Sequence, residues 1–336
     1  MCLIKDSKME NVNKTPVQFL SPVEHNFGET SVSVPLENSS QNALRLQTLT
    51  AEELLPLKLP PREYALEPIL PFPGLAMIYA PRGLGKTYVA LSISHAIASG
   101  GRALRWDAPK QLRVLHIDGE MPAPALQERL AQIVAGSGMA PPDENWLRFV
   151  IGDLALDGLP NINAQEGMRA IEQAAADADV ILLDNLSTLA AGMRENEADD
   201  WGAFQSWLMR MRRAGKLVIL IHHAGKGGNQ RGTSRREDAL DTVIALRRPQ
   251  DYTPEEGARF EVHVEKARGA MGPDVAPFEA RLVKAPKGGL AWVEGPIIDR
   301  DLDKALALIA DGKSIREAAR ETGISKSTLS RKARVH

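Results

Sequence analysis

A glycine-rich segment that ends in Gly85-Lys86-Thr87 has the chemistry of a phosphate-binding loop. It follows an apolar run, Gly74 to Tyr79, and precedes a helical pattern from Tyr88 to Ala98. Backbone N–H groups of such a loop surround phosphate oxygens, and the next helix adds unpaired N–H groups and the positive end of its dipole. We therefore expect a nucleoside triphosphate to bind through Ala80, Pro81, Arg82, Gly83, Leu84, Gly85, Lys86, Thr87 and Tyr88.

Two side chains of this loop have separate tasks. Lys86 is expected to reach the β- and γ-phosphates, and the Thr87 hydroxyl to bind Mg²⁺. Ala80 replaces the first glycine of the usual pattern G-x-x-x-x-G-K-S/T, which predicts some strain in the turn. Gly83 and Gly85 remain, so the cradle is kept. The alternative is a chance Gly-Lys-Thr in a strand-to-helix turn, which the flanking segments disfavour.

Carboxylates follow two further apolar runs. Asp184 ends the run Val180–Leu183, and in enzymes with this loop such an aspartate orients the Mg²⁺ shell. The alternative role is a simple strand-end cap. Asp118 and Glu120 follow an earlier run, where one of them can act as the general base that orients the attacking water. Glu120 is favoured for its longer reach, and a turn built on Asp-Gly is the alternative.

The run Leu217–Ile221 ends in His222 and His223, and a polar side chain here can hydrogen-bond the γ-phosphate. A metal-binding histidine pair is the alternative, but no third ligand is evident. The glycine-rich loop that follows is expected to grip a nucleic-acid backbone, unless it is only a solvated loop. Its basic residues are Lys226, Arg231, Arg235 and Arg236.

Lys266 and Arg268 lie near the end of a late strand and alternate along it, so they are expected to point to the same side. They could reach the γ-phosphate bound by a neighbouring subunit, as arginine fingers do.

Short apolar runs alternate with helical patterns and must position these groups. The first five runs predict a mostly parallel sheet covered on both faces, and the last three an antiparallel extension at one edge. The fold class is therefore α/β. Expected strands are 75–79, 113–117, 147–151, 180–183, 217–221, 242–247, 260–265 and 278–284, with helices at 86–99, 123–135, 164–177 and 199–214.

Composition and length set limits on the organisation. The 336 residues carry a formal net charge of −2, so any nucleic-acid contact must come from local basic patches. No apolar run approaches a membrane span, and the single Cys2 allows no disulfide within the chain, so a cytoplasmic protein is expected. We expect a flexible arm at 1–48, an ATPase domain at 49–295, whose proline-rich start to about residue 73 is extended, and a small helical unit at 300–336.

The small unit has the pattern of a helix-turn-helix. Ser314 and Ser325 are expected to cap two short helices, and Gly323 to end the first of them. A small helical cap on the ATPase is the alternative. In a helix-turn-helix the side chains that face the major groove are expected to be Lys326, Ser327, Thr328 and Arg331.

Taken together, residues 60–285 resemble the RecA-like hexameric ATPases, and most closely the plasmid RepA-type helicases among the AAA family ATPases. The C-terminal unit resembles a resolvase-type helix-turn-helix. The resemblance rests on the Gly-Lys-Thr loop and on four ordered segments, 118–121, 222–227, 231–234 and 238–241, together with the Asp184 strand. The segment Lys266-Ala267-Arg268-Gly269 is similar to the finger of the DnaB helicases.

The resemblance implies roles for several residues. Glu120 matches the catalytic glutamate, His223 the phosphate sensor, and Lys266 and Arg268 the pair that acts on a neighbour. The loops near 191–199 and 225–236 match those that face single-stranded DNA in a central channel, although the first is acidic here.

The leading hypothesis is thus an ATP- and Mg²⁺-dependent, ring-forming DNA helicase of plasmid or phage type. The implied assembly is a hexamer that encloses single-stranded DNA, with duplex contact through the C-terminal module. The alternative is an ATP-switched DNA-binding regulator that does not unwind DNA. A small-molecule kinase fits poorly, because nothing resembles a lid.

Overall fold

A computed structural model describes residues 48–190, 198–225, 238–298 and 300–333. The chain divides into two units between Leu59 and Pro60. In the first unit, the described residues form one short helix, α1 (Ala51–Leu54), which begins with a capping box of Thr50 and Glu53 and buries none of its residues.

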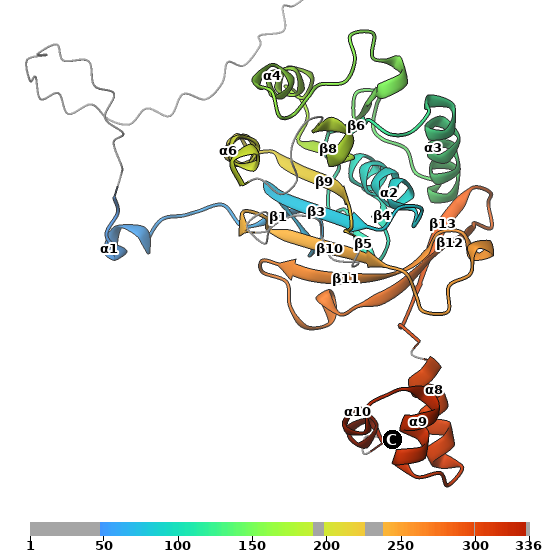
Figure 1. Cartoon of the computed structure of the whole chain (residues 1–336). Coiled ribbons are helices and arrows are strands. Elements are labelled where there is room, and N and C mark those ends of the chain that lie inside the picture. The colour runs from blue at the N-terminus through green and yellow to red at the C-terminus, as the bar shows by residue number, and fades with distance from the viewer. Residues whose placement is uncertain (1–47, 191–197, 226–237, 299, 334–336) are drawn as a thin grey trace, which may run out of the picture. The chain divides into compact units, whose positions relative to one another are not determined.

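The second unit contains a sheet of nine strands among the described residues (Figure 1). From one edge to the other these are β13 (Leu290–Gly295), β12 (Phe278–Lys284), β11 (Arg259–Ala267), β10 (Thr242–Arg247), β3 (Gly74–Ala80), β9 (Leu217–His223), β8 (Val180–Asp184), β6 (Val114–Asp118) and β7 (Leu147–Ile151).

The strands from β10 to β7 are parallel, and β11, β12 and β13 extend the sheet antiparallel beyond β10. The strand β9 lies between β3, which leads into the glycine-rich loop, and β8, which ends at Asp184. This is a RecA-like α/β core, as expected from the sequence. Because the carboxyl ends of parallel strands meet at one edge, the loop, Asp118, Asp184 and His223 come together there.

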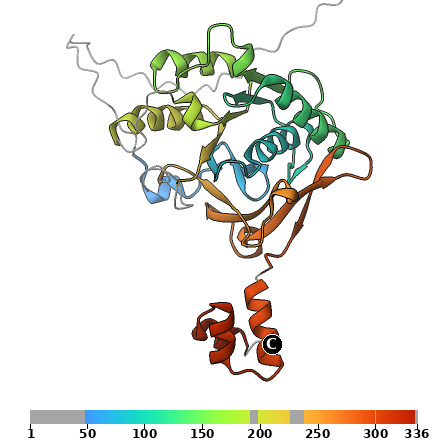
Figure 2. The same cartoon turned by 45° about the vertical axis from the view of Figure 1, so that its right-hand side comes forward.

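Alternate side chains of each central strand enter two different cores. On β3, Ala76 and Ile78 pack towards α2 (Lys86–Ser99), whereas Leu75 and Met77 pack towards α6 (Ala198–Arg213). Helix α3 (Ala123–Ser137) packs on α2, while α4 (Gln165–Ala174) and α5 (Leu186–Leu189) share the core of α6, so helices cover both faces (Figure 2).

Three details differ from the expectations. The lead-in before residue 73 is not simply extended, because β1 (Glu63–Leu66) and β2 (Leu70–Phe72) form an antiparallel hairpin that buries Leu66 and Leu70. The strand β10 pairs parallel with β3, since Asp241 enters beside Leu75 at the amino end of β3. The edge strand β13 was not expected.

Short elements complete this unit. They are the β4–β5 pair (Arg102–Ala103 and Trp106–Asp107) and the 3-10 helices η1 (Gly152–Leu154), η2 (Pro254–Glu256) and η3 (Gly272–Val275). In the described part of the chain, no helix combines the length and apolar character needed to cross a membrane.

The C-terminal residues form three helices, α8 (Arg300–Ala310), α9 (Ile315–Thr322) and α10 (Lys326–Lys332). The Ser314 hydroxyl accepts from the Glu317 N–H, and Gly323 ends α9 with a φ of 73°. Ser325 caps α10. The fully buried centre of this unit is formed by Ala305, Ala318 and Leu329, and the partly buried Ala319 packs against it.

Candidate nucleotide-binding and ATPase site

The glycine-rich loop turns sharply from β3 into α2. Gly83 and Gly85 have φ values of 74° and 98°, a region in which side chains are strained. Gly85 also has no room for a side chain, because a Cβ there would lie 2.9 Å from the Cβ of Ala258. Ala80 ends β3 in strand geometry and does not have a positive φ, so the expected strain from the missing first glycine does not occur.

Lys86 folds back over the loop that precedes it. Its ammonium donates to the carbonyl oxygens of Ala80 and Pro81, at 3.2 and 2.9 Å, and the residue is buried. Burial lowers the pKa of Lys86, and the charges of Asp184 and Glu120 act in the opposite direction. The ammonium therefore sits inside the loop beside two carboxylates, where incoming phosphate oxygens would add to its partners.

Thr87 and Asp184 lie in contact at the start of α2. The Thr87 side chain lowers the pKa of the nearby Asp184 carboxyl, and Asp184 Oδ2 is buried with no hydrogen-bond partner in the described residues. Burial and the neighbouring carboxylates of Asp118 and Glu120 raise the pKa of Asp184 to about 7. A hydroxyl and a buried carboxylate with a spare oxygen suit Mg²⁺, which prefers oxygen ligands and retains several waters.

The two carboxylates after β6 have different environments. Asp118 is fully buried, and its Oδ1 accepts from the N–H groups of Glu120 and Met121 at 2.9 and 2.7 Å. This bond shapes the turn, as the Asp-Gly alternative predicts. The Glu120 side chain is 48% exposed and lines the open space over the glycine-rich loop. Only Glu120 is therefore placed to meet a water molecule in the cleft.

The end of β9 brings a histidine to Glu120. His223 lies on the α2 side of the sheet, and its Nε2 is 3.5 Å from Glu120 Oε2. His222 is its neighbour on the strand and points to the opposite face. The geometry thus distinguishes the two histidines that the sequence places side by side.

Asn185 connects these groups and was missed in the sequence. Its amide Nδ2 donates to Glu120 Oε2 and lies 3.2 Å from His223 Nε2. Its Oδ1 accepts from the Thr188 N–H and caps α5. A single asparagine after a strand-end aspartate has no distinctive pattern, so only the fold could show this contact.

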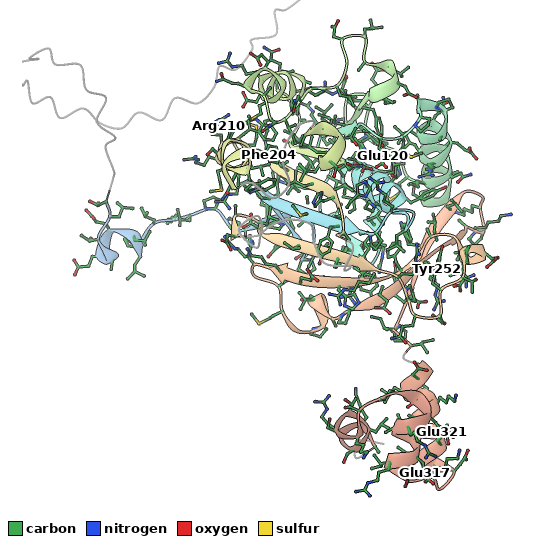
Figure 3. The ribbon with its side chains drawn as sticks, viewed as in Figure 1. Glu120, Phe204, Arg210, Tyr252, Glu317 and Glu321 are labelled. Carbon is green, nitrogen blue, oxygen red and sulfur yellow. The ribbon has the colours of Figure 1, made fainter. Side chains whose placement is uncertain are left out.

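A cleft of about 460 Å³ opens over the loop. Its second wall comes from the connection between β10 and β11, which no sequence motif marks. Figure 3 labels Tyr252 on this connection and Glu120 on the other side. The remaining lining includes the loop residues together with Tyr88, Met121, Arg129, His223, Pro254, Gly257 and Ala258.

Lys266 and Arg268 lie far from this cleft. Both donate to the Asp238 carbonyl oxygen, at 3.4 and 2.9 Å, and so share one side as expected. The guanidinium of Arg268 also lies 3.6 Å from Asp241. The Arg268 N–H bonds the Asp241 carbonyl, and the Asp241 N–H bonds Leu75 at the start of β3. The pair therefore sits at the amino end of β3, opposite the glycine-rich loop.

The expected DNA contacts fall into two groups. Lys226, Arg231, Arg235 and Arg236, and the acidic loop from 191 to 197, lie outside the described residues. In the C-terminal unit Lys326, Ser327 and Arg331 are exposed on α10. Thr328 is half-buried, and its hydroxyl and N–H both bond the Ser325 cap. The Thr328 hydroxyl is therefore already bonded within the helix cap, whereas Lys326, Ser327 and Arg331 are exposed.

Comparisons with known proteins give two family matches and a set of similar structures. The profile of a family described as AAA domain matches residues 40–229, and that of a helix-turn-helix, Psq domain, matches residues 298–336. Among solved structures, a KaiC-like protein of the archaeon Pyrococcus horikoshii is 14% identical with a TM-score of 0.47, covering 68% of this chain and 93% of its own. The flagellar accessory protein FlaH of Methanocaldococcus jannaschii is 12% identical with a TM-score of 0.43, covering 66% of this chain and 89% of its own.

The AAA-domain match spans more than half of the chain and contains the glycine-rich loop, Glu120, Asp184 and His223. The second match coincides with the three-helix unit and favours DNA binding there over a simple helical cap. The chain belongs to the AAA-domain family of P-loop ATPases, with a RecA-like core and a C-terminal helix-turn-helix.

Proposed function

We propose that this protein is an ATP-hydrolysing, ring-forming DNA motor of the plasmid or phage replicative helicase type. The observation that carries the proposal is the position of Lys266 and Arg268. Arg268 lies level with Leu75, and Ala80 is five residues farther along β3, a distance of about 17 Å at about 3.4 Å per residue. An arginine side chain cannot span that distance to its own loop, so the pair would serve the site of a neighbouring subunit.

Within one site, each residue has a defined task in hydrolysis. Lys86 and the loop N–H groups would hold the β- and γ-phosphates, and Thr87 and Asp184 would hold Mg²⁺, which neutralises phosphate charge when bound. Glu120 would orient the attacking water and take its proton. Asn185 and His223 contact Glu120, so they would fix its position and sense the γ-phosphate.

The test is ATP hydrolysis with and without single-stranded DNA, on protein sized by light scattering in the presence of nucleotide. Strong stimulation by DNA in a hexamer-sized species supports the motor, and strand separation of a forked duplex then tests the helicase. Lys86→Ala is the control for contaminating ATPases. Hydrolysis by a monomer that ignores DNA would refute the ring-forming motor.

The helix-turn-helix match favours a second candidate, an ATP-switched regulator that binds a specific duplex sequence and does not unwind it. Deletion of residues 301–336 separates the two candidates. A motor should keep hydrolysis that single-stranded DNA stimulates, whereas a regulator should lose every response to DNA. Thermal melting of the shortened protein verifies that the ATPase core remains folded.

A further inference from the structure

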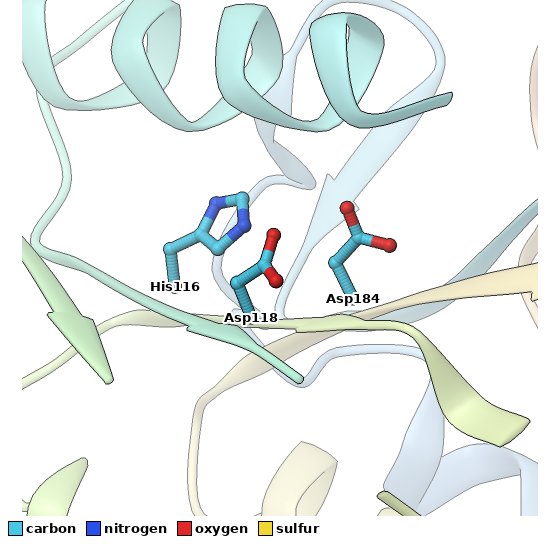
Figure 4. A group of neighbouring side chains, drawn as sticks. All are labelled: His116, Asp118 and Asp184. Carbon is cyan, nitrogen blue, oxygen red and sulfur yellow. The ribbon is translucent and has the colours of Figure 1, made fainter. Parts of the chain in front are cut away.

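Three buried side chains converge beneath the first turns of α2 (Figure 4). His116 and Asp118 are two residues apart on β6 and therefore point to the same face of the sheet. Asp184 stands beside Asp118 on the neighbouring strand β8, where the two residues are paired in register. The atoms that these three side chains offer to a ligand all lie within 4.8 Å of one another.

Each of the three side chains has a buried polar atom without a hydrogen-bond partner in the part of the chain that the structure describes. These atoms are His116 Nε2, Asp118 Oδ2 and Asp184 Oδ2. The residues are 0, 0 and 2% exposed, so bulk water does not reach these atoms. Leaving one such atom unsatisfied is costly, and three that face one another indicate a missing ligand.

A water molecule alone satisfies this group poorly. The second ring nitrogen of His116, Nδ1, is 2.9 Å from the Ser94 hydroxyl on α2. When Nδ1–H donates to Ser94, Nε2 presents a lone pair, and with both carboxylates ionised the group consists of three acceptors. A water has only two hydrogens to donate, and it leaves both carboxylate charges unbalanced. A cation satisfies the three acceptors together.

We propose that His116, Asp118 and Asp184 bind a divalent transition-metal ion, of which Mn²⁺ is the probe, in the nucleotide-free protein. An imidazole with two carboxylates suits Mn²⁺, Fe²⁺ or Zn²⁺, whereas Mg²⁺ favours oxygen ligands and water. Ligand atoms that are each about 2.0–2.2 Å from one ion lie up to about 4.4 Å apart, so small side-chain movements close the site. The Ser94 hydroxyl fixes the imidazole tautomer, as outer partners of metal-bound histidines do.

The site is distinct from the one proposed for the Mg²⁺ of the nucleotide, although Asp184 belongs to both. Asp184 Oδ2 has no hydrogen-bond partner among the described residues and is assigned to the transition metal, which leaves Oδ1 for the ion beside Thr87. One carboxylate thus presents one oxygen to each ion. The transition metal needs no nucleotide, so its binding can be measured even if the proposed ATPase role is wrong.

The experiment uses the full chain, stripped with a chelator and free of nucleotide. Mn²⁺ is titrated in while the electron paramagnetic resonance signal of free Mn²⁺ is followed, and bound Mn²⁺ is examined for electron spin-echo modulation by ¹⁴N. The expected result is tight binding of one ion per chain that excess Mg²⁺ does not displace, with the nitrogen modulation of a coordinated imidazole.

Two variants test the assignment. His116→Gln should abolish the nitrogen modulation and weaken Mn²⁺ binding at least about tenfold, and Ser94→Ala should weaken binding about tenfold while keeping the modulation. Ser99→Ala is the matched control, with unchanged Mn²⁺ binding, because the Ser99 hydroxyl on the same helix bonds only the His95 carbonyl oxygen among the contacts described and does not touch the three ligands. Thermal melting checks the fold of each variant, and Ser94→Ala and the wild-type spectrum decide the question if His116→Gln does not fold.

Three results would overturn the proposal. They are no Mn²⁺ binding below millimolar concentration, bound Mn²⁺ without nitrogen modulation, and unchanged binding by folded His116→Gln. A site filled only by ordered water would give the first of these results.

Discussion

The side-chain amide of Asn185 donates a hydrogen bond to the carboxylate of Glu120, although the two residues are 65 positions apart in the chain. Asn185 is fully buried and fixed by its own bond to the Thr188 N–H, so it is a rigid support for a half-exposed carboxylate. The direction in which Glu120 points is therefore set by β8 and α5 as well as by its own strand.

Replacing Asn185 by aspartate should remove this support selectively. The Oδ1 atom of the introduced aspartate would still cap α5, because aspartate is as good a cap as asparagine, but the donor to Glu120 becomes a like charge. We expect Asn185→Asp to lower kcat for ATP about tenfold to a hundredfold, with KM within about twofold of the original. Steady-state hydrolysis measures this. Thr188→Ala is the control for the position of Asn185, because it removes the hydroxyl bond to Asn185 Oδ1 and keeps the N–H bond of the cap. Equal losses in both variants would assign Asn185 a structural role only.

Glu120 and Asp118 should respond differently to removal of charge. Glu120→Gln should bind ATP as before and lose about a hundredfold or more of turnover, because the base that orients water is absent. Nucleotide binding by fluorescence and turnover by phosphate release measure the two quantities. Asp118→Asn is the comparison, since Asp118 Oδ1 shapes the turn. Unchanged turnover in Glu120→Gln would remove Glu120 from the role.

The nucleotide-free protein should be destabilised by ionisation of Asp184. The pKa of this carboxyl is raised to about 7 in the folded protein, against about 3.9 when unfolded. The folded state therefore holds a proton that the unfolded state has lost, and stability falls as pH rises from about 4 to about 7. Asp184→Asn removes this loss. We expect its Tm to exceed that of the original protein by roughly 3–8 °C at pH 8, and the difference to disappear below about pH 4.

Thermal melting across pH, in chelator and without nucleotide, measures this difference. The same variant should lose the additional stabilisation that ATP and Mg²⁺ give the original protein, because the metal shell lacks its carboxylate. A variant that melts below the original protein at pH 8 would contradict the assigned direction of the pKa shift.

If Arg268 acts on the site of a neighbouring subunit, mixing two inactive variants should restore part of the ATPase activity. Arg268→Ala keeps an intact site, and Glu120→Gln keeps an intact Arg268. At equal mixing about a quarter of the interfaces combine both intact halves, so about a quarter of the original activity should return. Hydrolysis by the re-assembled mixture measures this. Activity that stays at the sum of the two variants would show that Arg268 does not act between subunits.

Arg268 also pairs with Asp241, so a structural effect must be separated from the catalytic one. Arg212 lies 3.5 Å from the same aspartate and has no proposed role at an interface. Arg212→Ala is therefore the matched control, and it should retain most of its ATPase activity.

Exposed basic residues of α10 should contribute to duplex binding through phosphate charge. We expect Arg331→Ala to weaken binding to duplex DNA about threefold to tenfold and to reduce the slope of log affinity against log salt by about one. Fluorescence anisotropy at several salt concentrations measures both. Lys304, exposed on α8, gives the control variant Lys304→Ala, which should leave the slope unchanged.

The core strands were predictable because their apolar residues both favour strand conformation and are the residues that the fold buries. Buried parallel strands are continuous apolar runs, as in β3, β8 and β9. Three segments also have the predicted ends, 147–151, 242–247 and the antiparallel 278–284. The β1–β2 hairpin was not predictable in this way. Its prolines, Pro68 and Pro71, argue against regular structure, and the hairpin forms because Leu66, Ile69 and Leu70 enter the core.

The site shows the same division. Lys86, Thr87 and Asp184 belong to sequence motifs that follow apolar strands, so their position at the carboxyl edge of the sheet could be predicted. Asn185, Tyr252 and His116 belong to no motif, and they reach the site only through strand order and register. The family resemblance selected His223, and the alternation of side chains along β9 gives the physical reason, because His223 lies on the α2 side of the sheet and His222 on the opposite side.

The strand β3 connects the glycine-rich loop with the aspartate that pairs with Arg268. At its carboxyl end β3 continues into the glycine-rich loop, and at its amino end the Leu75 N–H bonds the carboxylate of Asp241, which holds Arg268. A buried strand between two neighbours is stiff, so displacement of the loop would shift Arg268 with it. In a closed ring, the nucleotide bound by one subunit would then change the position of the arginine that the same subunit presents to its neighbour's site.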